Sequence, residues 1–296
     1  MLFANSREET AASAEYDKGY WRVDMLTRIL TSAIGIVVFF AALFSPARIF
    51  MAAILIVTAM MLGEMYGVLK CGMLVNVIGY IAAAIAAVGT VYASGKFMTG
   101  ALVAIVTIYL VTAVILHGKK SARDILSHGF ITVFLTVFMC YVIRLRMTFS
   151  VYAALWVFVI AWLTDTGAYF TGVFLGKHKL VPHISPKKTV EGAVGGVVVC
   201  VIASAVYAYI LNVFAAGERE IVIDVFVSYV LMGLVGSALS QIGDFAASCI
   251  KRDCDVKDYG SILPGHGGLM DRFDSVVFIA PFVYYAMWCI NYALAI

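Results

Sequence analysis

Long apolar runs alternate with short polar segments along the whole chain. A helix of about 20 apolar residues spans the hydrocarbon core of a bilayer, so each long run predicts a membrane-spanning helix. Nine runs are long enough: 25–45, 47–69, 73–93, 98–116, 125–143, 150–175, 189–214, 225–250 and 273–295. Ser45 and Pro46 separate the first two runs, which we expect to form a tight helical hairpin. The pattern predicts an all-α polytopic membrane protein with about nine transmembrane helices.

The polar segments divide the chain into three parts. Residues 1–24 are polar and of mixed charge. They are too long and too acidic for the start of a signal peptide, which predicts a cytosolic tail before an uncleaved first helix. We expect residues 25–145 to hold the first five helices. Residues 150–296 hold the last four, together with two long polar loops at 176–188 and 251–272.

The distribution of lysine and arginine predicts the orientation. These residues are enriched in the cytosolic loops of membrane proteins. With the N-terminus in the cytosol, the loops on that side carry sixteen of the 21 Lys and Arg residues, and the opposite loops carry five. We therefore expect a cytosolic N-terminus and an outer C-terminus. Both long polar loops then lie together at the cytosolic membrane surface, where we expect the active site.

Composition supports a membrane protein and shows where charge is concentrated. Hydrophobic residues make up 63% of the chain and charged residues 13%, about half the charged share of a typical soluble domain. The segment 248–274 nevertheless holds nine of the 39 charged side chains. The six cysteines show no CxxC spacing, which predicts free thiols and neither a disulfide framework nor a zinc site.

The eighth predicted helix places a carboxylate and two cations on one face. At 3.6 residues per turn, Ser240, Asp244, Ser248, Lys251 and Arg252 share that face. An ionisable residue within a membrane span is functional by default, and the face could hold a metal ion and a polyphosphate. The alternative is a helix end at which Asp244 pairs locally with a neighbouring Arg or Ser.

Two further carboxylates, Asp271 and Asp274, begin the ninth predicted helix on one side of its first turn. They also suit the positive end of the helix dipole, so a purely structural role is open. Beside Asp244 they would form the oxygen-rich site that Mg2+ prefers. We expect Asp244 and Asp271 to be direct ligands and Asp274 a third ligand or a neighbour of the ligands. A second metal ion is left open.

Between these helices lies the turn 264–268, Pro-Gly-His-Gly-Gly. Its backbone N–H groups could face phosphate oxygens, with His266 donating a further bond. Such a turn alone is more often only a turn. The cations on either side change that interpretation, because Arg and Lys bind phosphate. We interpret them as phosphate clamps: Lys251, Arg252, Lys257 and Arg272.

A second polar patch covers residues 165–192. Ser185 and Pro186 are typical of the first positions of a helix, which would begin the seventh span. Lys187, Lys188 and Thr189 would follow in its first turn. A helix N-terminus with two lysines is a natural anion site, although ordinary anchoring of positive loops at the cytosolic face explains the lysines equally well.

Both patches resemble the signature of phosphatidate cytidylyltransferases. From Ser248 to Asp274 the chain reads Ser-x-apolar-Lys-Arg, four residues, Lys-Asp-x-small, then Leu-Pro-x-His-Gly-Gly-apolar-x-Asp-Arg-apolar-Asp, with no departure at a specified position. The patch Asp-Thr-x-Ala-Tyr, then Gly-Lys, then Ser-Pro-Lys-Lys-Thr-x-Glu-Gly resembles the family's second block. The resemblance covers roughly a fifth of the chain.

The resemblance implies transfer of CMP from CTP to phosphatidic acid, which gives CDP-diacylglycerol and pyrophosphate in a Mg2+-dependent reaction. It also implies that Asp165, Lys187, Lys188 and Glu191 line the same cavity as the first patch. The candidate catalytic residues are Asp244, Lys251, Arg252, Lys257, His266, Asp271 and Asp274. The candidate substrate- and phosphate-binding residues are Asp165, Ser185, Lys187, Lys188, Glu191, Ser248, Gly265, Gly267, Gly268 and Arg272.

Two other functions stay open at this point. One is a different membrane phosphotransferase acting on a lipid phosphate or alcohol. The other is an ion-coupled transporter that uses Asp165 and Asp244, although transporters tend to show internal repeats. The expected partners are CTP and a bilayer lipid, with no nucleic acid, and a homodimer is left open. We expect the cytoplasmic membrane of a prokaryote. Glu64 has no obvious partner, and we expect His128 to be an ordinary, hydrogen-bonded helix residue.

Overall fold

The computed structural model describes residues 27, 29–92, 95–211 and 223–294. Within them, eight helices are long and apolar enough to cross a membrane. These helices are α2 (Ala47–Leu69), α3 (Met73–Tyr92), α4 (Gly95–Ile115), α5 (Ala122–Thr148), α6 (Val151–Leu175), α7 (Val190–Ile210), α8 (Ile223–Asp253) and α9 (Met270–Leu294). A shorter apolar helix, Ile29–Phe44, precedes them. The expected tail, residues 1–24, and part of the expected first span lie outside the described residues. The predicted helical, multi-pass architecture is confirmed.

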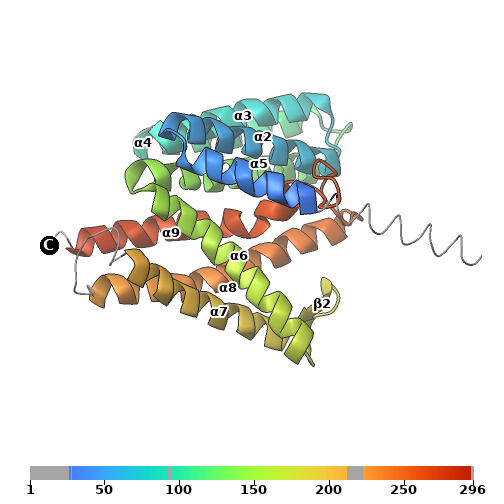
Figure 1. The fold of residues 1–296 in the computed structure, drawn as a ribbon. Helices are drawn as coiled ribbons and strands as arrows, with labels where there is room; N and C mark the ends of the chain where they lie inside the picture. The colour runs from blue at the N-terminus through green and yellow to red at the C-terminus, as the bar shows by residue number, and fades with distance from the viewer. Residues whose placement is uncertain (1–26, 28, 93–94, 212–222, 295–296) are drawn as a thin grey trace, which may run out of the picture.

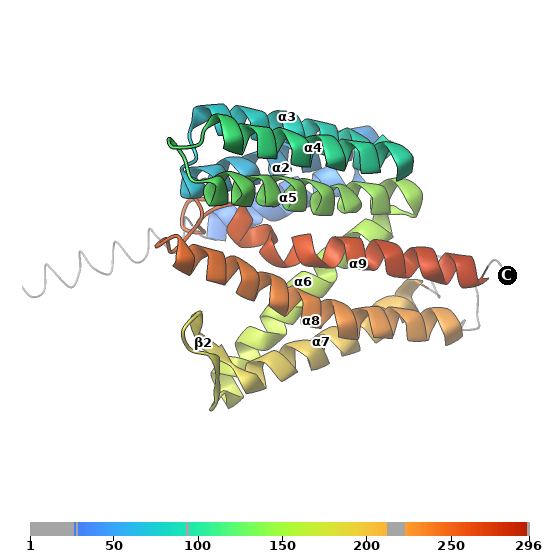
Figure 2. The same cartoon turned by 180° about the vertical axis from the view of Figure 1, so that it is seen from behind.

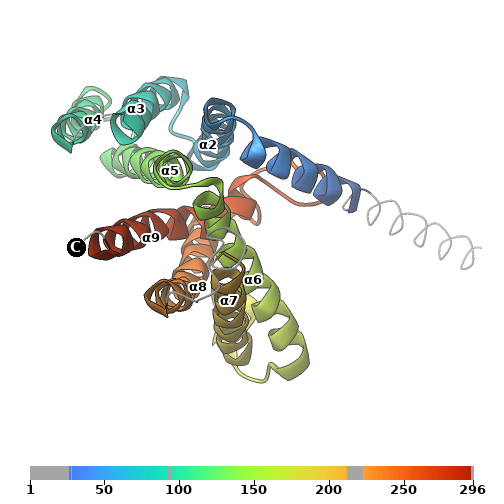
Figure 3. The same ribbon diagram turned by 60° about the vertical axis from the view of Figure 1, so that its left-hand side comes forward.

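The helices form two neighbouring groups. Helices α2–α5 make one group and α6–α9 the other, and Figure 3, which looks nearly along the helices, separates them clearly. Helix α5 packs against α2, α3 and α4 and also against α6 and α9, so it joins the groups. The helix Ile29–Phe44 contacts the second group through Phe39, whose ring packs against those of Phe158 and Trp162 of α6.

The main core lies between α2, α5, α6 and α9. Trp156 and Phe158 of α6 are among its largest fully buried side chains, together with Leu135 and Met139 of α5. His128 is also fully buried; it hydrogen-bonds to Tyr109 and Asn76. The expectation of an ordinary, hydrogen-bonded helix histidine is confirmed. All six cysteines are free, as predicted.

Helices α6 and α7 approach each other unusually closely at glycines. A Cβ atom on Gly196 of α7 would lie 2.7 Å from the backbone oxygen of Thr164 on α6. One on Gly192 would lie 2.8 Å from the backbone oxygen of Ala168. Small residues of this kind allow helix backbones to pack closely inside a membrane. The contact brings the start of α7 against the end of α6, the two helices that flank the hairpin of the polar patch 165–192.

The up-and-down path of the helices gathers the polar segments at one end of the bundle. Figures 1 and 2 place β2 at the same end as the start of α9 and the end of α8. Contacts across the chain agree: Lys188 pairs with Asp244 of α8, and Ser32 hydrogen-bonds to His266 at 3.0 Å. The two long polar loops therefore lie together. Which side of the membrane they face stays a prediction.

The structure corrects the expected start of the seventh helix. Residues Lys179–Val181 (β1) and Ser185–Thr189 (β2) form a two-stranded antiparallel hairpin. Ser185 and Pro186 therefore belong to a strand and do not begin the helix. Proline disfavours helical backbone at the residue before it, and the hydroxyl of Thr189 accepts the N–H of Gly192 at 3.1 Å. Thr189 is thus the N-cap, and α7 begins at Val190.

Candidate active site

A cavity of about 330 Å³ lies where α6, the β-hairpin, α7 and α8 meet. Four residues predicted from the sequence line it: Asp165, Lys187, Lys188 and Asp244. The sequence did not single out its other lining residues as site residues; these are Ala168, Tyr169, Gly172, Val173, Leu180, Thr189, Gly192, Ala193 and Gln241. The lining therefore combines two lysines with two carboxylates, and apolar and uncharged polar side chains complete it.

Lys188 is the central charge of this cavity. Its ammonium group forms an ion pair with Asp244 and lies 4.3 Å from the centre of the Phe245 ring. Burial lowers the pKa of Lys188, because desolvation penalises the charged form. The carboxylates of Asp165 and Asp274 act in the opposite direction and favour the ammonium. One lysine thus interacts with acids on α6, α8 and α9.

A second ion pair lies beside the first. Lys251 of α8 donates to Oδ1 of Asp271 on α9 at 2.7 Å, and both side chains are largely buried. The positive charge of Lys251 also acts on Lys188 and further lowers its pKa. The two ion pairs therefore belong to one electrostatic cluster at the junction of β2, α8 and α9. This cluster joins the two polar patches that were recognised separately in the sequence.

The carboxylates suit Mg2+ by their chemistry, because Mg2+ prefers hard oxygen ligands. Asp244 and Asp271 each already bind an ammonium group, and Asp274 is buried. Among the described residues, no group of three or more His, Cys, Asp or Glu side chains is gathered closely enough to hold a metal. A metal ion would compete with Lys188 for Asp244 and with Lys251 for Asp271.

The turn 264–268 is held by its own hydrogen bonds. Gly265 and Gly267 have φ angles of 74° and 82°, which favour glycine. The N–H of His266 bonds to the backbone oxygen of Leu263, and that of Gly268 bonds to Asp271. The expected row of consecutive free N–H groups is therefore interrupted at these two positions. Arg272 bonds to the backbone oxygen of His266 through Nε at 3.2 Å and Nη2 at 2.6 Å.

Several other predicted residues lie outside the cavity lining. Glu191 binds the ring of His178 at 2.6 Å and accepts the backbone N–H groups of Lys177 and His178. These bonds tie the start of the hairpin to α7, a role for His178 that the sequence did not suggest. Besides Glu191, the predicted residues that do not line the cavity are Ser185, Ser248, Lys251, Arg252, Lys257, Gly265, His266, Gly267, Gly268, Asp271, Arg272 and Asp274.

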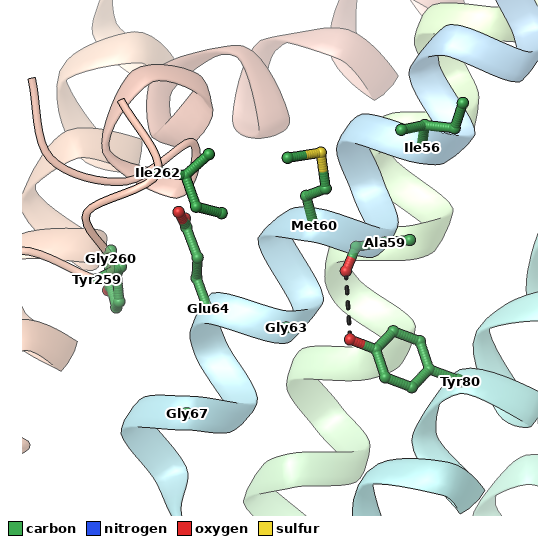
Figure 4. Close-up of a pocket in the computed structure, with 10 residues that line it drawn as sticks. All are labelled: Ile56, Ala59, Met60, Gly63, Glu64, Gly67, Tyr80, Tyr259, Gly260 and Ile262. Atoms are coloured by element: carbon green, nitrogen blue, oxygen red, sulfur yellow. Dashed lines mark hydrogen bonds between the residues drawn. The ribbon is translucent and has the colours of Figure 1, made fainter. Parts of the chain in front are cut away.

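Glu64 is a residue of this region whose partners the sequence did not identify. It lies on α2, far from both patches in sequence, yet its carboxylate accepts the N–H groups of Leu269 and Met270. Figure 4 shows its side chain directed from α2 toward the loop that holds Tyr259, Gly260 and Ile262. An acidic residue within an apolar run was the only signal in the sequence.

Three bacterial proteins named phosphatidate cytidylyltransferase are similar to the chain. The Bacillus subtilis protein is 41% identical over 171 residues, which cover 54% of this chain and 58% of that protein. The Haemophilus influenzae protein is 34% identical over 155 residues, covering 50% and 52%. The Staphylococcus saprophyticus protein is 45% identical over 127 residues, covering 43% and 45%.

The chain spans about half the length of the curated relatives it matches. The sequence model of the cytidylyltransferase family covers much more of it and matches residues 26–290. That match runs from the first apolar helix into α9 and includes the cavity, both ion pairs and the turn 264–268. This protein therefore belongs to the cytidylyltransferase family.

Proposed function

We propose that the protein transfers CMP from CTP to phosphatidic acid and releases CDP-diacylglycerol and pyrophosphate. A phosphate oxygen of the lipid attacks the α-phosphorus of CTP. A new P–O bond forms, and the bond from that phosphorus to the oxygen of the leaving pyrophosphate breaks. The observation that carries the proposal is the cluster of two lysines and several carboxylates beside a cavity at one end of membrane-spanning helices.

This site suits the chemistry of phosphoryl transfer. The attacking phosphate monoester is already largely ionised near neutral pH, because its second pKa is about 6. The main tasks are therefore to hold two polyanions together and to stabilise negative charge on the leaving group. Lys188 and Lys251, with Lys187 and Arg272 nearby, supply positive charge for both tasks. The lipid reaches the site from the bilayer, and CTP reaches it from the cytosol.

Mg2+ is the proposed metal: Asp244 and Asp271 would exchange Lys188 and Lys251 for it, with Asp274 as a third ligand or a neighbour of the ligands. When bound, such a metal neutralises phosphate oxygens and supports in-line displacement. We expect Asp244→Asn and Asp271→Asn each to raise the Mg2+ concentration needed for half-maximal turnover about tenfold or more. Binding of Mn2+ to the purified protein without substrates, followed by electron paramagnetic resonance, checks the same ligands independently of turnover. Unchanged Mn2+ binding in both variants would refute the assignment.

One assay tests the proposed reaction directly. Purified protein in detergent is supplied with phosphatidic acid, Mg2+ and one labelled nucleotide at a time, and the lipid extract is examined for label. We expect label from CTP, and none when diacylglycerol replaces phosphatidic acid. Label in lipid from UTP but not from CTP would reject the proposed substrate. We place the protein in the cytoplasmic membrane of a bacterium, in keeping with the bacterial relatives.

A further inference from the structure

Glu64 connects the first group of helices to the start of α9. Its side chain is 7% exposed. Oε1 accepts the N–H of Leu269 at 2.9 Å, and Oε2 accepts the N–H of Met270 at 2.8 Å. The first N–H groups of a helix have no partner within the helix, and a carboxylate also suits the positive end of the helix dipole. Glu64 therefore caps α9 from a position 205 residues earlier in the chain.

Two glycines of the adjoining loop make room for this carboxylate. A Cβ atom on Gly260 would lie 2.5 Å from Oε1 of Glu64, and one on Gly268 would lie 2.6 Å from Oε2. Neither glycine has a positive φ angle, so a turn conformation does not explain them. Their contribution is the close approach of the loop backbone to Glu64. Any side chain at either position would push the carboxylate away from its two donors.

The segment that Glu64 holds also binds a proposed catalytic acid. Oδ2 of Asp271 accepts the N–H of Tyr259 at 2.9 Å and that of Gly268 at 3.1 Å, while its Oδ1 pairs with Lys251. Glu64 and Asp271 thus both accept hydrogen bonds from the backbone of the segment 259–270, which includes the loop and the start of α9. A shift of the backbone of residues 259–270 therefore also moves Asp271, and it disturbs the ion pair between Asp271 and Lys251.

We propose that Glu64 is a positioning residue for the transfer reaction. It fixes the start of α9 and the loop 259–268, and it thereby keeps Asp271 and the cationic side chains beside it correctly positioned relative to the cavity. This inference rests on the proposed function. Glu64 itself touches neither substrate: its two oxygens are occupied by backbone donors. It lies in the wall of an open groove between α2, Tyr80 of α3 and this loop, outside the lining of the cationic cavity (Figure 4).

The test compares Glu64→Ala and Glu64→Gln with the wild type. A misplacement of about 1 Å at a reacting centre costs about 100-fold in rate, so we expect Glu64→Ala to lower kcat by about that factor. Glu64→Gln loses less, because its amide oxygen still accepts one of the two bonds. The loss falls more on kcat than on KM for CTP. Thr58→Val is the matched control on the same helix, since that buried hydroxyl bonds only to the backbone of Ile54 among the contacts described.

Hydrogen exchange separates positioning from a general loss of stability. In both Glu64 variants we expect faster amide exchange in peptides that contain residues 259–271, and unchanged exchange in the peptides of α5. Wild-type kcat together with wild-type exchange in Glu64→Ala would overturn the proposal. The proposal would also be overturned if amide exchange became faster throughout the chain and the loss of activity matched the loss of folded protein.

A double-mutant cycle gives a second, independent test. Gly260→Ala is expected to lower kcat in the wild-type background and to have little further effect in Glu64→Ala, because its methyl group acts by displacing Glu64. Gly67→Ala is the control, since a Cβ atom there meets nothing within 4 Å. Additive effects of Gly260→Ala and Glu64→Ala overturn the proposal. If the wild type itself transfers no CMP, the proposed function fails, and hydrogen exchange still tests what Glu64 holds in place.

Discussion

At the scale of single residues, the site is organised by pairs of opposite charge. Lys188 and Lys251 are partly or largely buried, and each binds an aspartate on a neighbouring element. Breaking one partner of such a pair leaves an uncompensated charge in a poorly solvated place. These lysines therefore hold the carboxylates in position. In the proposed reaction they turn toward phosphate groups.

The first prediction concerns Lys188. We expect Lys188→Gln to lower kcat by about 100- to 1,000-fold, the loss that follows removal of one electrostatic group at a transition state. The measurement is the rate of label transfer from CTP to lipid at saturating substrates. Lys179→Gln is the control, because Lys179 is exposed on the facing strand of the same hairpin. Equal rates for Lys188→Gln and the control would contradict the role of Lys188.

At the scale of elements, the cavity depends on how closely α6 and α7 pack. The glycines of α7 let its backbone touch that of α6, and Thr189 caps α7 at the point where β2 ends. Because β2 carries Lys187 and Lys188, the angle and position of α7 decide where these lysines lie. Gln241 of α8 adds a further tie, since its side chain donates to the backbone oxygen of Ala193 at 3.1 Å.

The second prediction tests this helix contact. We expect Gly196→Ala to destabilise the protein by about 1–3 kcal/mol, because the added methyl group would overlap the backbone of Thr164. Gly100→Ala on α4 is the matched control: a Cβ atom there meets nothing within 4 Å. The thermal unfolding midpoint in detergent, followed by tryptophan fluorescence, compares the two. A midpoint for Gly196→Ala at or above that of the control would show that the contact is not tight.

At the scale of the whole molecule, the polar groups needed for phosphate chemistry stand at one end of a bundle whose sides are apolar. The large exposed side chains of α3, α4 and α7 are mostly hydrophobic, as expected for surfaces that face lipid. The other end carries cations of its own: Arg144 donates to the hydroxyl of Tyr284 at 2.6 Å. The asymmetry of lysine and arginine between the two ends predicts that the end with the Lys188–Asp244 and Lys251–Asp271 ion pairs, here called the proposed catalytic end, faces the cytosol.

The third prediction is this orientation. In a variant that lacks the six native cysteines, single cysteines replace Lys119, Ser261 or Thr148, all of which are exposed. Lys119 and Ser261 lie at the proposed catalytic end, and Thr148 ends α5 at the opposite end. A membrane-impermeant maleimide should label Thr148→Cys in intact spheroplasts, and the other two only after lysis. The reverse labelling pattern would place the proposed catalytic end outside.

The amino-acid sequence by itself determined the spanning helices and the segments of the chain in which charged residues gather. Hydropathy is a local property, so runs of about 20 apolar residues predict helices without knowledge of their neighbours. The same holds for the concentration of charge in 248–274 and for Asp271 at the start of α9. The hairpin Lys179–Thr189 was not predicted, because its short strands lie in a polar segment without a hydrophobic pattern.

Only the tertiary structure decided which charged groups meet. Lys188 and Asp244 are distant in sequence, as are Glu64 and Met270, and no periodicity connects either pair. Their contacts follow from the order in which α2, α7, α8 and α9 pack and from glycines that let backbones approach. A carboxylate within an apolar run shows that a partner is needed, because an unpaired charge is costly there. The identity of the partner depends on packing between helices far apart in the chain.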